Sequence, residues 1–540
     1  MKHPQMVRSQ FLIFFTLSFG LTIAGTALAQ NFDEFEAKDF SKEIDQTVAQ
    51  VQRLARTGAY QPNWESLEQY RIPEWYQDAK LGIFIHWGVY TVPEHGWEWY
   101  PRQMYIDKDN WRGNLFQYHR DTYGDQSEFG YKDLIPKFKA EKFDPEEWVT
   151  LFKQAGAKYV VPVAEHHDGF AMYDSDLTQW SSVKMGPKRD VVGELEKETR
   201  KQGLRFGVSS HRAFNWLYYV RKTEFDNADP RFKGLYGRPI PELFKDDAAD
   251  YKKNWPPHDQ KFKDEWLART GELVSKYNPD LVWFDFGIAN DRNRPPQENP
   301  FQDHLKSFAS FYYNSAASRD VEPVINYKWS AFPERAAVLD LERSKLNDIR
   351  ELYWQTDSSV AKNSWCYVDK LNYRTSDSLI DDLIDIVSKN GGLLLNVCPR
   401  ADGSIPDEQK KLLKEIGQWL SINGEAIYGS RPFKTYGEGP TETVTGHLSE
   451  NKNKPFGSKD FRFTTQDRGH TLYAFALKPT AGETIVITKL KKGNSLHLKP
   501  ESVELLGSET KLSWEQTDSG LEVEFPQELP HSAAVVLKIK

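Results

Sequence analysis

Ionisable side chains stand directly after, or at the end of, five short apolar runs in this sequence. If each run is a buried β-strand, these polar groups need partners or a function, because burying them unpaired costs free energy. Two carboxylates placed in this way suit glycoside hydrolysis: one attacks the anomeric carbon, and the other protonates the leaving oxygen and later activates water. Histidines can hydrogen-bond to sugar hydroxyls. The groups are His86, Glu165-His166-His167-Asp168, Ser209-Ser210-His211, Asp285 and Asp340-Leu341-Glu342.

Metal and nucleotide chemistry have weaker support in the same residues. His166 and His167 could form a metal pair, but adjacent residues of a strand point to opposite faces, so one ion would not readily take both. The chain has no Cys/His spacing of a zinc site, and no Gly-x-Gly-x-x-Gly turn follows the first apolar run. Residues 186–190 look like a phosphate-binding or basic patch, which we interpret instead as a turn in which Asp190 caps a helix. We expect neither a metal nor another cofactor.

The apolar runs alternate with amphipathic segments that are typical of helices. Continuous apolar strands separated by helices indicate a parallel sheet covered on both faces. Seven or eight such units predict a (β/α)8-like barrel, in which active residues lie at the carboxyl ends of the strands; an open, doubly wound sheet is the alternative. The expected strands are 81–86, 159–164, 204–208, 281–284, 323–326, 336–341 and 393–397, and the expected helices are 144–155, 191–202, 262–277, 376–389 and 406–422.

The pattern changes at both ends of the chain. Residues 1–29 combine a basic start, an apolar run and the small-x-small sequence Ala27-Leu-Ala29, which predicts a cleaved signal peptide and export to the periplasm or the medium. The apolar run is short for the alternative, a transmembrane anchor. Residues 30–428 contain a helical lead-in and the predicted barrel. Residues 429–540 contain short strands that predict a C-terminal antiparallel β-sandwich, at 472–477, 484–487, 521–525 and 534–537.

The composition fits a globular protein without a polyanionic partner. The 540 residues carry 70 Lys and Arg against 78 Asp and Glu, and this net charge of −8 argues against nucleic acid or an anionic membrane as partner. The 17 Trp, 25 Tyr and 32 Phe weakly favour a carbohydrate ligand, since flat apolar faces suit the C–H surfaces of sugars. The two cysteines, Cys366 and Cys398, stand in apolar runs, and we expect both to be small buried residues.

Six sequence blocks in a fixed order resemble glycoside hydrolase family 29, the α-L-fucosidases. The resemblance spans residues 64–433, nearly the whole predicted catalytic region. Each block alone would be a weak signal, whereas their number and order make a strong one. The blocks are 80–90 (KLGIFIHWGVY), 98–100 (EWY), 165–170 (EHHDGF), 186–190 (GPKRD), 283–285 (WFD) and 393–396 (LLLN).

The resemblance implies a retaining mechanism without a metal ion, and it suggests roles for individual residues. Asp285 matches the nucleophile of the family. Trp365 is expected to line the pocket for the C5 methyl group of fucose, and His211 and Trp283 are expected second contacts. The positions that match residues holding the fucose hydroxyls and ring are His86, Glu98, Trp99, His166 and His167.

The general acid/base is harder to place, because its position varies between subgroups of the family. We assign it to Glu342, since Asp340-Leu-Glu-Arg343 resembles a block of one subgroup; Glu334 and Glu351 are the alternatives. Simpler interpretations exist for several candidates. Asp285 could cap a helix or belong to a buried ion pair, Glu342 could be a solvated loop residue, and the two tryptophans Trp99 and Trp365 could be core aromatics.

Together these residues predict an exo-acting α-L-fucosidase. It would remove terminal α-L-fucose from oligosaccharides or glycoconjugates through a covalent glycosyl-enzyme intermediate. Two alternatives stay open: a non-catalytic fucose- or glycan-binding protein on the same fold, and an enzyme for a related sugar, such as an α-L-galactosidase.

Overall fold

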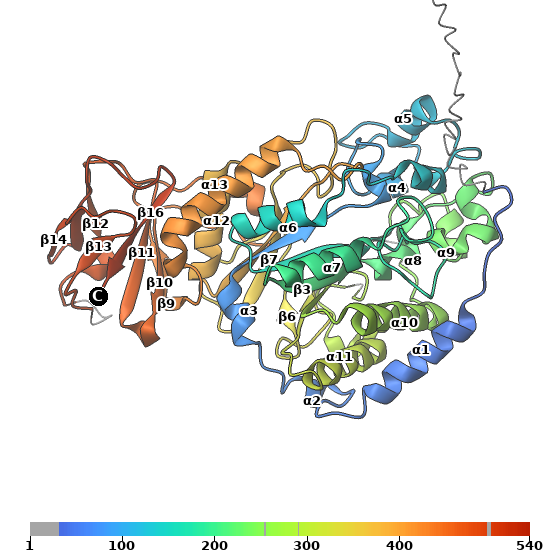
Figure 1. Cartoon of the computed structure of the whole chain (residues 1–540), viewed down its shortest axis with the longest axis horizontal. Helices are drawn as coiled ribbons and strands as arrows, with labels where there is room; N and C mark the ends of the chain where they lie inside the picture. Colours follow the sequence, from blue (N-terminus) through green and yellow to red (C-terminus); the bar gives the residue numbers. More distant parts are fainter. Residues whose placement is uncertain (1–31, 253–254, 290, 494–497) are drawn as a thin grey trace, which may run out of the picture. The chain divides into compact units, whose positions relative to one another are not determined.

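The computed structural model describes residues 32–252, 255–289, 291–493 and 498–540 (Figure 1). The predicted leader, residues 1–29, lies outside these ranges, so the signal peptide stays a prediction. No helix within the described ranges is both long and apolar enough to span a bilayer. Residues 36–540 form one compact unit that contains both of the sheet regions.

Eight parallel strands form a nearly closed barrel. Their order is β6-β5-β4-β3-β2-β1-β8-β7, and an isolated parallel bridge between Asp340 and Gln355 links the two edges. The predicted barrel is therefore confirmed, and the open doubly wound sheet is wrong. The strands are β1 (Leu81–Ile85), β2 (Tyr159–Glu165), β3 (Arg205–Ser210), β4 (Leu281–Phe284), β5 (Val324–Tyr327), β6 (Val338–Leu339), β7 (Trp354–Ser359) and β8 (Gly391–Val397).

Helices connect most of the strands, but not those at the seam of the barrel. Residues 328–353, all within the described ranges, contain no helix, so β5, β6 and β7 are joined by irregular chain alone. The helices are α1 (Ser41–Leu54), α2 (Trp64–Leu67), α3 (Glu74–Ala79), α4 (Tyr100–Gln103), α5 (Leu115–Thr122), α6 (Pro145–Gln154), α7 (Val191–Lys201), α8 (Asn215–Tyr218), α9 (Lys233–Tyr236), α10 (Gln260–Tyr277), α11 (Gln302–Ala317), α12 (Ser376–Ser388) and α13 (Asp407–Asn423).

Local capping explains why two of the expected helices begin where they do. Asp144 accepts hydrogen bonds from the first backbone N–H groups of α6, and Pro145 occupies the first turn. Asp190 likewise accepts from the backbone N–H of Gly193 at 2.9 Å, which confirms it as the cap of α7. Helix α11 was missed. No side chain caps its N-terminus, and the sequence signal for its start is correspondingly weak.

The chain after the barrel forms two antiparallel sheets, as predicted, with a shared apolar core. Helices α12 and α13 of the barrel pack beside these strands (Figure 1), and Trp419 of α13 donates to the carbonyl oxygen of Ala534 at 2.8 Å. One sheet has the order β13-β16-β11-β10-β9 and the other β12-β15-β14. The strands are β9 (Arg431–Glu438), β10 (Phe461–Gln466), β11 (Thr471–Leu477), β12 (Thr484–Ile487), β13 (Val503–Leu505), β14 (Ser513–Gln516), β15 (Leu521–Glu524) and β16 (Ala534–Ile539).

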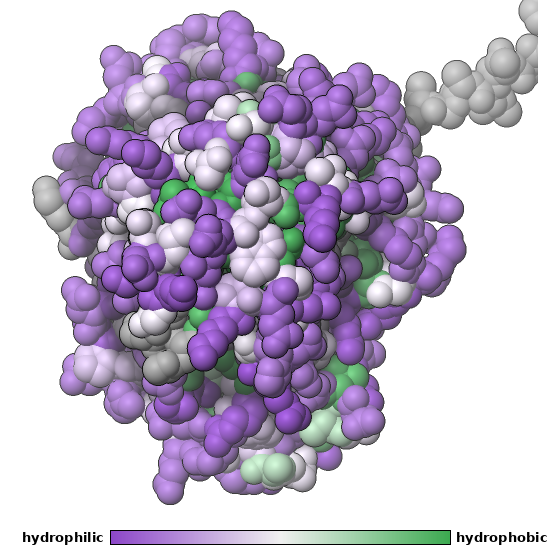
Figure 2. Space-filling model, turned by 90° about the vertical axis from the view of Figure 1, so that its left-hand side faces the viewer, coloured by the Kyte–Doolittle hydropathy of each residue, from purple (hydrophilic) through white to green (hydrophobic). Residues whose placement is uncertain are grey.

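The surface on the side of these strands is largely hydrophilic, with hydrophobic residues visible only in small areas between polar ones (Figure 2). The described residues of that face therefore present no broad apolar patch of the kind that marks a large docking surface. Both cysteines are buried and free, which confirms the expectation that they are small interior residues.

Glu165, the last residue of β2, supplies a buried ion pair beneath the strand ends. Its carboxylate pairs with Arg269 of α10 at 2.8 Å and with Arg212, and all three side chains are almost inaccessible to solvent. Removing one partner of such a cluster leaves buried charge uncompensated, which costs more free energy than the intact cluster contributes.

We expect Glu165→Ala to lower the free energy of unfolding by about 3–5 kcal/mol, because buried Arg269 loses its paired carboxylate and Arg212 is left with Glu265 alone. Denaturant titration measures this loss. The matched control is Glu196→Ala, which removes a surface pair with Arg200 at 2.6 Å and should cost below about 1 kcal/mol. A similar small cost for both variants would contradict the prediction.

Candidate active site

A cavity of about 1320 Å³ opens at the carboxyl ends of the barrel strands. Glu334 and Glu351, the alternatives for the acid/base, line a different cavity, where they pair with Arg350 at 3.1 Å and Arg335 at 3.4 Å. All ten residues that the sequence predicted for the site line the large cavity: His86, Glu98, Trp99, His166, His167, His211, Trp283, Asp285, Glu342 and Trp365.

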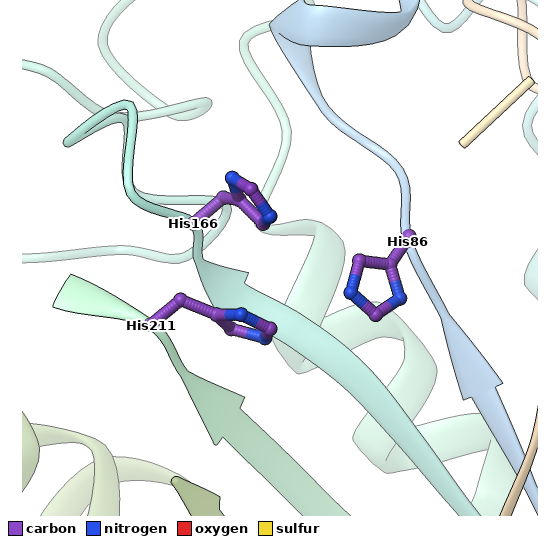
Figure 3. Close-up of side chains that lie close together, drawn as sticks. All are labelled: His86, His166 and His211. Atoms are coloured by element: carbon purple, nitrogen blue, oxygen red, sulfur yellow. The ribbon is translucent and has the colours of Figure 1, made fainter. Parts of the chain in front are cut away.

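Three histidines from the ends of β1, β2 and β3 turn their rings toward a common space (Figure 3). The ring centroid of His166 lies 5.8 Å from that of His86 and 4.8 Å from that of His211. His86 Nδ1 lies 2.8 Å from Asn396 Oδ1, whereas buried His166 Nδ1 has no hydrogen-bond partner among the described residues. Burial lowers the pKa of both His86 and His166 well below its ordinary value. The rings are therefore neutral and can donate to or accept from hydroxyl groups.

The same ring nitrogens lie close enough together to hold a metal ion. Among the residues that the structure describes, two groups qualify, His86 with His166 and His211, and His167 with His211 and Asp285. However, His211 belongs to both groups and already uses both nitrogens, since Nδ1 lies 3.0 Å from Asp285 Oδ2 and Nε2 lies 3.1 Å from Ser209 Oγ. This arrangement favours hydrogen bonding over metal ligation.

One step of the sequence argument against a metal was wrong. His166 and His167 do not point to opposite faces: β2 ends at Glu165, so both histidines follow the strand rather than belong to it. Their ring centroids are 4.6 Å apart, and both rings line the cavity. They differ in their partners, because His167 faces Asp285 while His166 does not.

Asp285, the residue after β4, has a fixed orientation. Its Oδ2 lies 3.0 Å from His211 Nδ1 and 3.2 Å from His167 Nε2, and its Oδ1 accepts from the backbone N–H of Phe286 at 2.8 Å. Burial by itself would raise the pKa of this carboxyl. Lys328 and the hydrogen bonds from the two histidines outweigh burial and hold the pKa well below its ordinary value, so the group is ionised.

Lys328, the residue after β5, lies among three carboxylates. Its Nζ is 3.0 Å from Glu342 Oε2, 3.2 Å from Asp357 Oδ2 and 3.5 Å from Asp285 Oδ1. Burial would lower its pKa, but these carboxylates raise the pKa well above its ordinary value. The ammonium group is therefore a permanent cation at the base of the cavity. It also lies 4.8 Å from the centre of the Trp283 ring, within reach of a cation–π interaction.

The shared cation brings Asp285 and Glu342 together. Asp285 Oδ1 and Glu342 Oε2 are at most 6.5 Å apart, which is the sum of their two distances to Lys328 Nζ. Carboxyl groups of retaining glycosidases are about 5–5.5 Å apart and those of inverting enzymes about 6.5–9.5 Å. The upper bound therefore lies at the bottom of the inverting range, which favours the retaining geometry.

Glu98 and Trp365 are joined across the wall of the cavity. Glu98 Oε2 accepts from the backbone N–H of Trp365 at 3.0 Å, and burial raises the pKa of Glu98. The Trp365 ring lies 5.2 Å from that of His86, and the Trp99 ring lies 5.8 Å from that of His167. Both tryptophans are only partly buried, so the interpretation as simple core aromatics does not fit them.

Sequence reasoning missed Lys328, Asp357 and a C-terminal segment that reaches the cavity. Lys328 directly follows β5, so the rule that found the other groups at strand ends would have found it as well. Asp357 lies within β7, a buried strand that is mostly polar and therefore gives no apolar run. The C-terminal contribution is His447, Leu448 and Asn451, which line the cavity from the connection between β9 and β10. No signal in the linear sequence places this segment near the barrel.

Comparisons with known proteins point to one family. Residues 47–425 match the family model described as alpha-L-fucosidase, and residues 454–540 match that of the alpha-L-fucosidase C-terminal domain. The chain is 31% identical to human tissue alpha-L-fucosidase over 493 residues, which cover 89% of this chain and 91% of the relative. The crystal structure of Thermotoga maritima alpha-fucosidase in complex with fucose is similar, with a TM-score of 0.69, 30% identity, and coverage of 89% of this chain and 100% of the other.

The electrostatic role of Lys328 can be tested by replacing it with methionine. In Lys328→Met the cation is lost, so the pKa of Asp285 should rise. As the pH is lowered, Asp285 should then become protonated at a higher pH than in the wild type. The acidic limb of the pH profile of kcat/KM should therefore move to higher pH, and kcat/KM should fall on the order of a hundredfold.

Lys328→Arg is the matched control, because it keeps the positive charge and should leave the acidic limb close to that of the wild type. An unmoved limb in Lys328→Met, measured with a chromogenic glycoside, would show that Lys328 does not keep Asp285 ionised.

Proposed function

Since the chain belongs to the α-L-fucosidases, glycoside hydrolase family 29, we propose that it cleaves terminal α-L-fucose from glycans in two steps with retention at the anomeric carbon. The protein is thus a glycoside hydrolase, and its substrate is a fucosylated glycan. The observation that carries the mechanism is the placement of Asp285 and Glu342 on one shared cation in the cavity. Residues 1–29 are proposed as the leader that directs its export.

In the first step Asp285 is the nucleophile. Its carboxylate attacks the anomeric carbon, the bond from that carbon to the leaving oxygen breaks, and Glu342 donates its proton to that oxygen. A fucosyl ester on Asp285 results. The histidine hydrogen bonds support this role, because they fix the direction of the carboxylate before the sugar arrives.

In the second step Glu342 acts as the base. It takes a proton from water, the water oxygen attacks the anomeric carbon, and the ester bond to Asp285 breaks, which restores both groups. Over the first step the negative charge passes from Asp285 to Glu342. Lys328 Nζ lies 3.5 Å from one and 3.0 Å from the other, so it stabilises the charge at both places without moving.

The fucose ring carries no charge, and the proposed contacts to its hydroxyls are hydrogen bonds that include neutral side chains. His86 and His166 are neutral, and His166 Nδ1 is buried without a partner in the part of the chain that the structure describes, so a substrate hydroxyl would satisfy it. Trp365 is proposed to contact the C5 methyl group. A related sugar with a hydroxymethyl group at C5 would need room and a polar partner beside this ring.

The two alternatives are separable by activity. A non-catalytic binding protein would have no use for an ionised nucleophile beside a second carboxylate, and it would bind fucose without turnover. An α-L-galactosidase would prefer the aryl α-L-galactoside to the aryl α-L-fucoside. A panel of aryl glycosides distinguishes the three readings.

Asp285→Asn should abolish hydrolysis of an aryl α-L-fucoside while the fold stays intact. The amide is nearly isosteric, but it cannot form the ester, so we expect kcat to fall by at least about 10⁴-fold. Circular dichroism and the melting temperature serve as the folding control. Wild-type turnover in this variant would remove Asp285 from the nucleophile role.

Glu342→Ala should impair substrates with poor leaving groups far more than aryl fucosides, because only the former depend on protonation of the leaving oxygen. Azide should restore turnover of the aryl substrate by replacing the water that Glu342 activates, and should give a fucosyl azide. An equal loss on both substrate classes without azide rescue would move the acid/base role to another residue.

A further inference from the structure

The segment 446–451, between β9 and β10, lies against the chain that carries Glu342. The backbone N–H of Leu448 donates to the carbonyl oxygen of Glu342 at 3.1 Å, and the N–H of Glu450 donates to that of Arg343 at 2.8 Å. Arg343 and Leu448 both have positive φ values, of 43° and 57°. Such conformations are unfavourable for these side chains and persist only where the surroundings hold them.

A buried ion pair reinforces these backbone contacts. The Glu450 carboxylate lies 2.7 Å from Arg343 Nη1 and accepts from Ser358 Oγ of β7 at 2.5 Å, and Arg374 lies 3.5 Å away. The Arg343 guanidinium in turn lies 4.3 Å from the centre of the Trp365 ring. Glu450 thus connects the C-terminal region with both the residue after the acid/base and a wall of the fucose pocket.

The same segment also presents side chains to the cavity beside Glu342. His447 Nδ1 lies 3.7 Å from Glu342 Oε2. Leu448 is 47% exposed, one of a few large apolar side chains so exposed among the described residues, and it lines the cavity together with Asn451. Burial lowers the pKa of His447, so all three of these side chains are uncharged at neutral pH.

The position of Glu342 determines what these side chains face. A general acid donates its proton to the oxygen between the two sugars, and that oxygen must lie within hydrogen-bonding distance of its carboxyl group. The leaving sugar must therefore lie within a few ångströms of Glu342. His447 lies beside this carboxylate, Leu448 is bonded to the backbone of the same residue, and both line the cavity, while the fucose contacts proposed above come from the barrel.

We propose that segment 446–451 forms the leaving-group subsite: His447 and Leu448 bind the sugar from which fucose is released, and Glu450 is a positioning residue that holds Glu342 through Arg343. The ligand is a neutral pyranose. The imidazole of His447 and the amide of Asn451 suit its hydroxyls, and the isobutyl group of Leu448 suits its C–H face. This inference rests on the proposed function of Glu342.

The test compares two substrates that share fucose and differ in the leaving group, an aryl α-L-fucoside and a neutral fucosyl disaccharide. Leu448→Ala and His447→Gln should each lower kcat/KM for the disaccharide about tenfold, mainly through KM, with a smaller loss on the aryl fucoside. The inhibition constant of free L-fucose should not change. Lys452→Gln, directly after the segment, exposed and outside the cavity, is the matched control with no effect on either substrate.

Glu450→Gln separates positioning from binding. It should lower kcat more than it raises KM for the disaccharide, and it should affect the aryl fucoside less, because only the disaccharide depends on protonation by Glu342. Glu450→Asp, which keeps the charge, should recover part of the loss. A melting temperature and a fucose inhibition constant close to the wild type exclude general damage.

Two results would overturn the inference while leaving the proposed function in place. The first is an equal loss of kcat/KM on both substrates in all three variants, and the second is no loss on either substrate in any of them. If the wild-type protein hydrolyses neither substrate, the proposed function itself falls, and the subsite with it.

Discussion

The site depends on one buried cation, the ammonium group of Lys328. A charge taken out of water costs several kcal/mol unless partners surround it, so its position is set by the carboxylates of Asp285, Glu342 and Asp357. These groups follow β4 and β6 or lie in β7, while Lys328 follows β5. The cation therefore connects four consecutive strands at one point.

The barrel is irregular at β5, β6 and β7, next to the chain that carries Glu342. No helix follows β5 or β6, β6 is only two residues long, and the seam is closed by a single bridge between Asp340 and Gln355. A regular barrel would place helices outside these strands and short loops above them. Here irregular chain carries Glu342, and a segment from the C-terminal region lies against it. The weakest part of the barrel wall is thus supported by chain from outside the barrel, through Glu450.

The barrel and most of its site could be predicted from the sequence because both depend on local patterns. Apolar runs mark buried strands, and the residues that follow them meet at one rim, which is why His86, His211 and Asp285 were found. β7 was not predicted because most of its buried residues are polar. Asp357 and its neighbours are buried as polar groups with partners, so they form no apolar run. The place of Leu448 in the site was not predicted for a different reason. Its contact with Glu342 spans more than a hundred residues, and no local pattern encodes it.

The distribution of charge explains how one cavity can both select a sugar and break its bond. The groups proposed to hold the fucose hydroxyls include His86 and His166, which burial keeps neutral, so they discriminate by hydrogen-bond geometry rather than by net charge. The charges gather at the reacting bond, where Lys328 Nζ already lies 3.5 Å from the ionised Asp285 and 3.0 Å from Glu342, the proposed acid, before substrate enters. Because the charge moves from one partner of Lys328 to the other during the reaction, the buried cation never loses its counter-ion. The arrangement that stabilises the folded site is therefore the same arrangement that stabilises charge in the transition state, and neither requires the protein to reorganise.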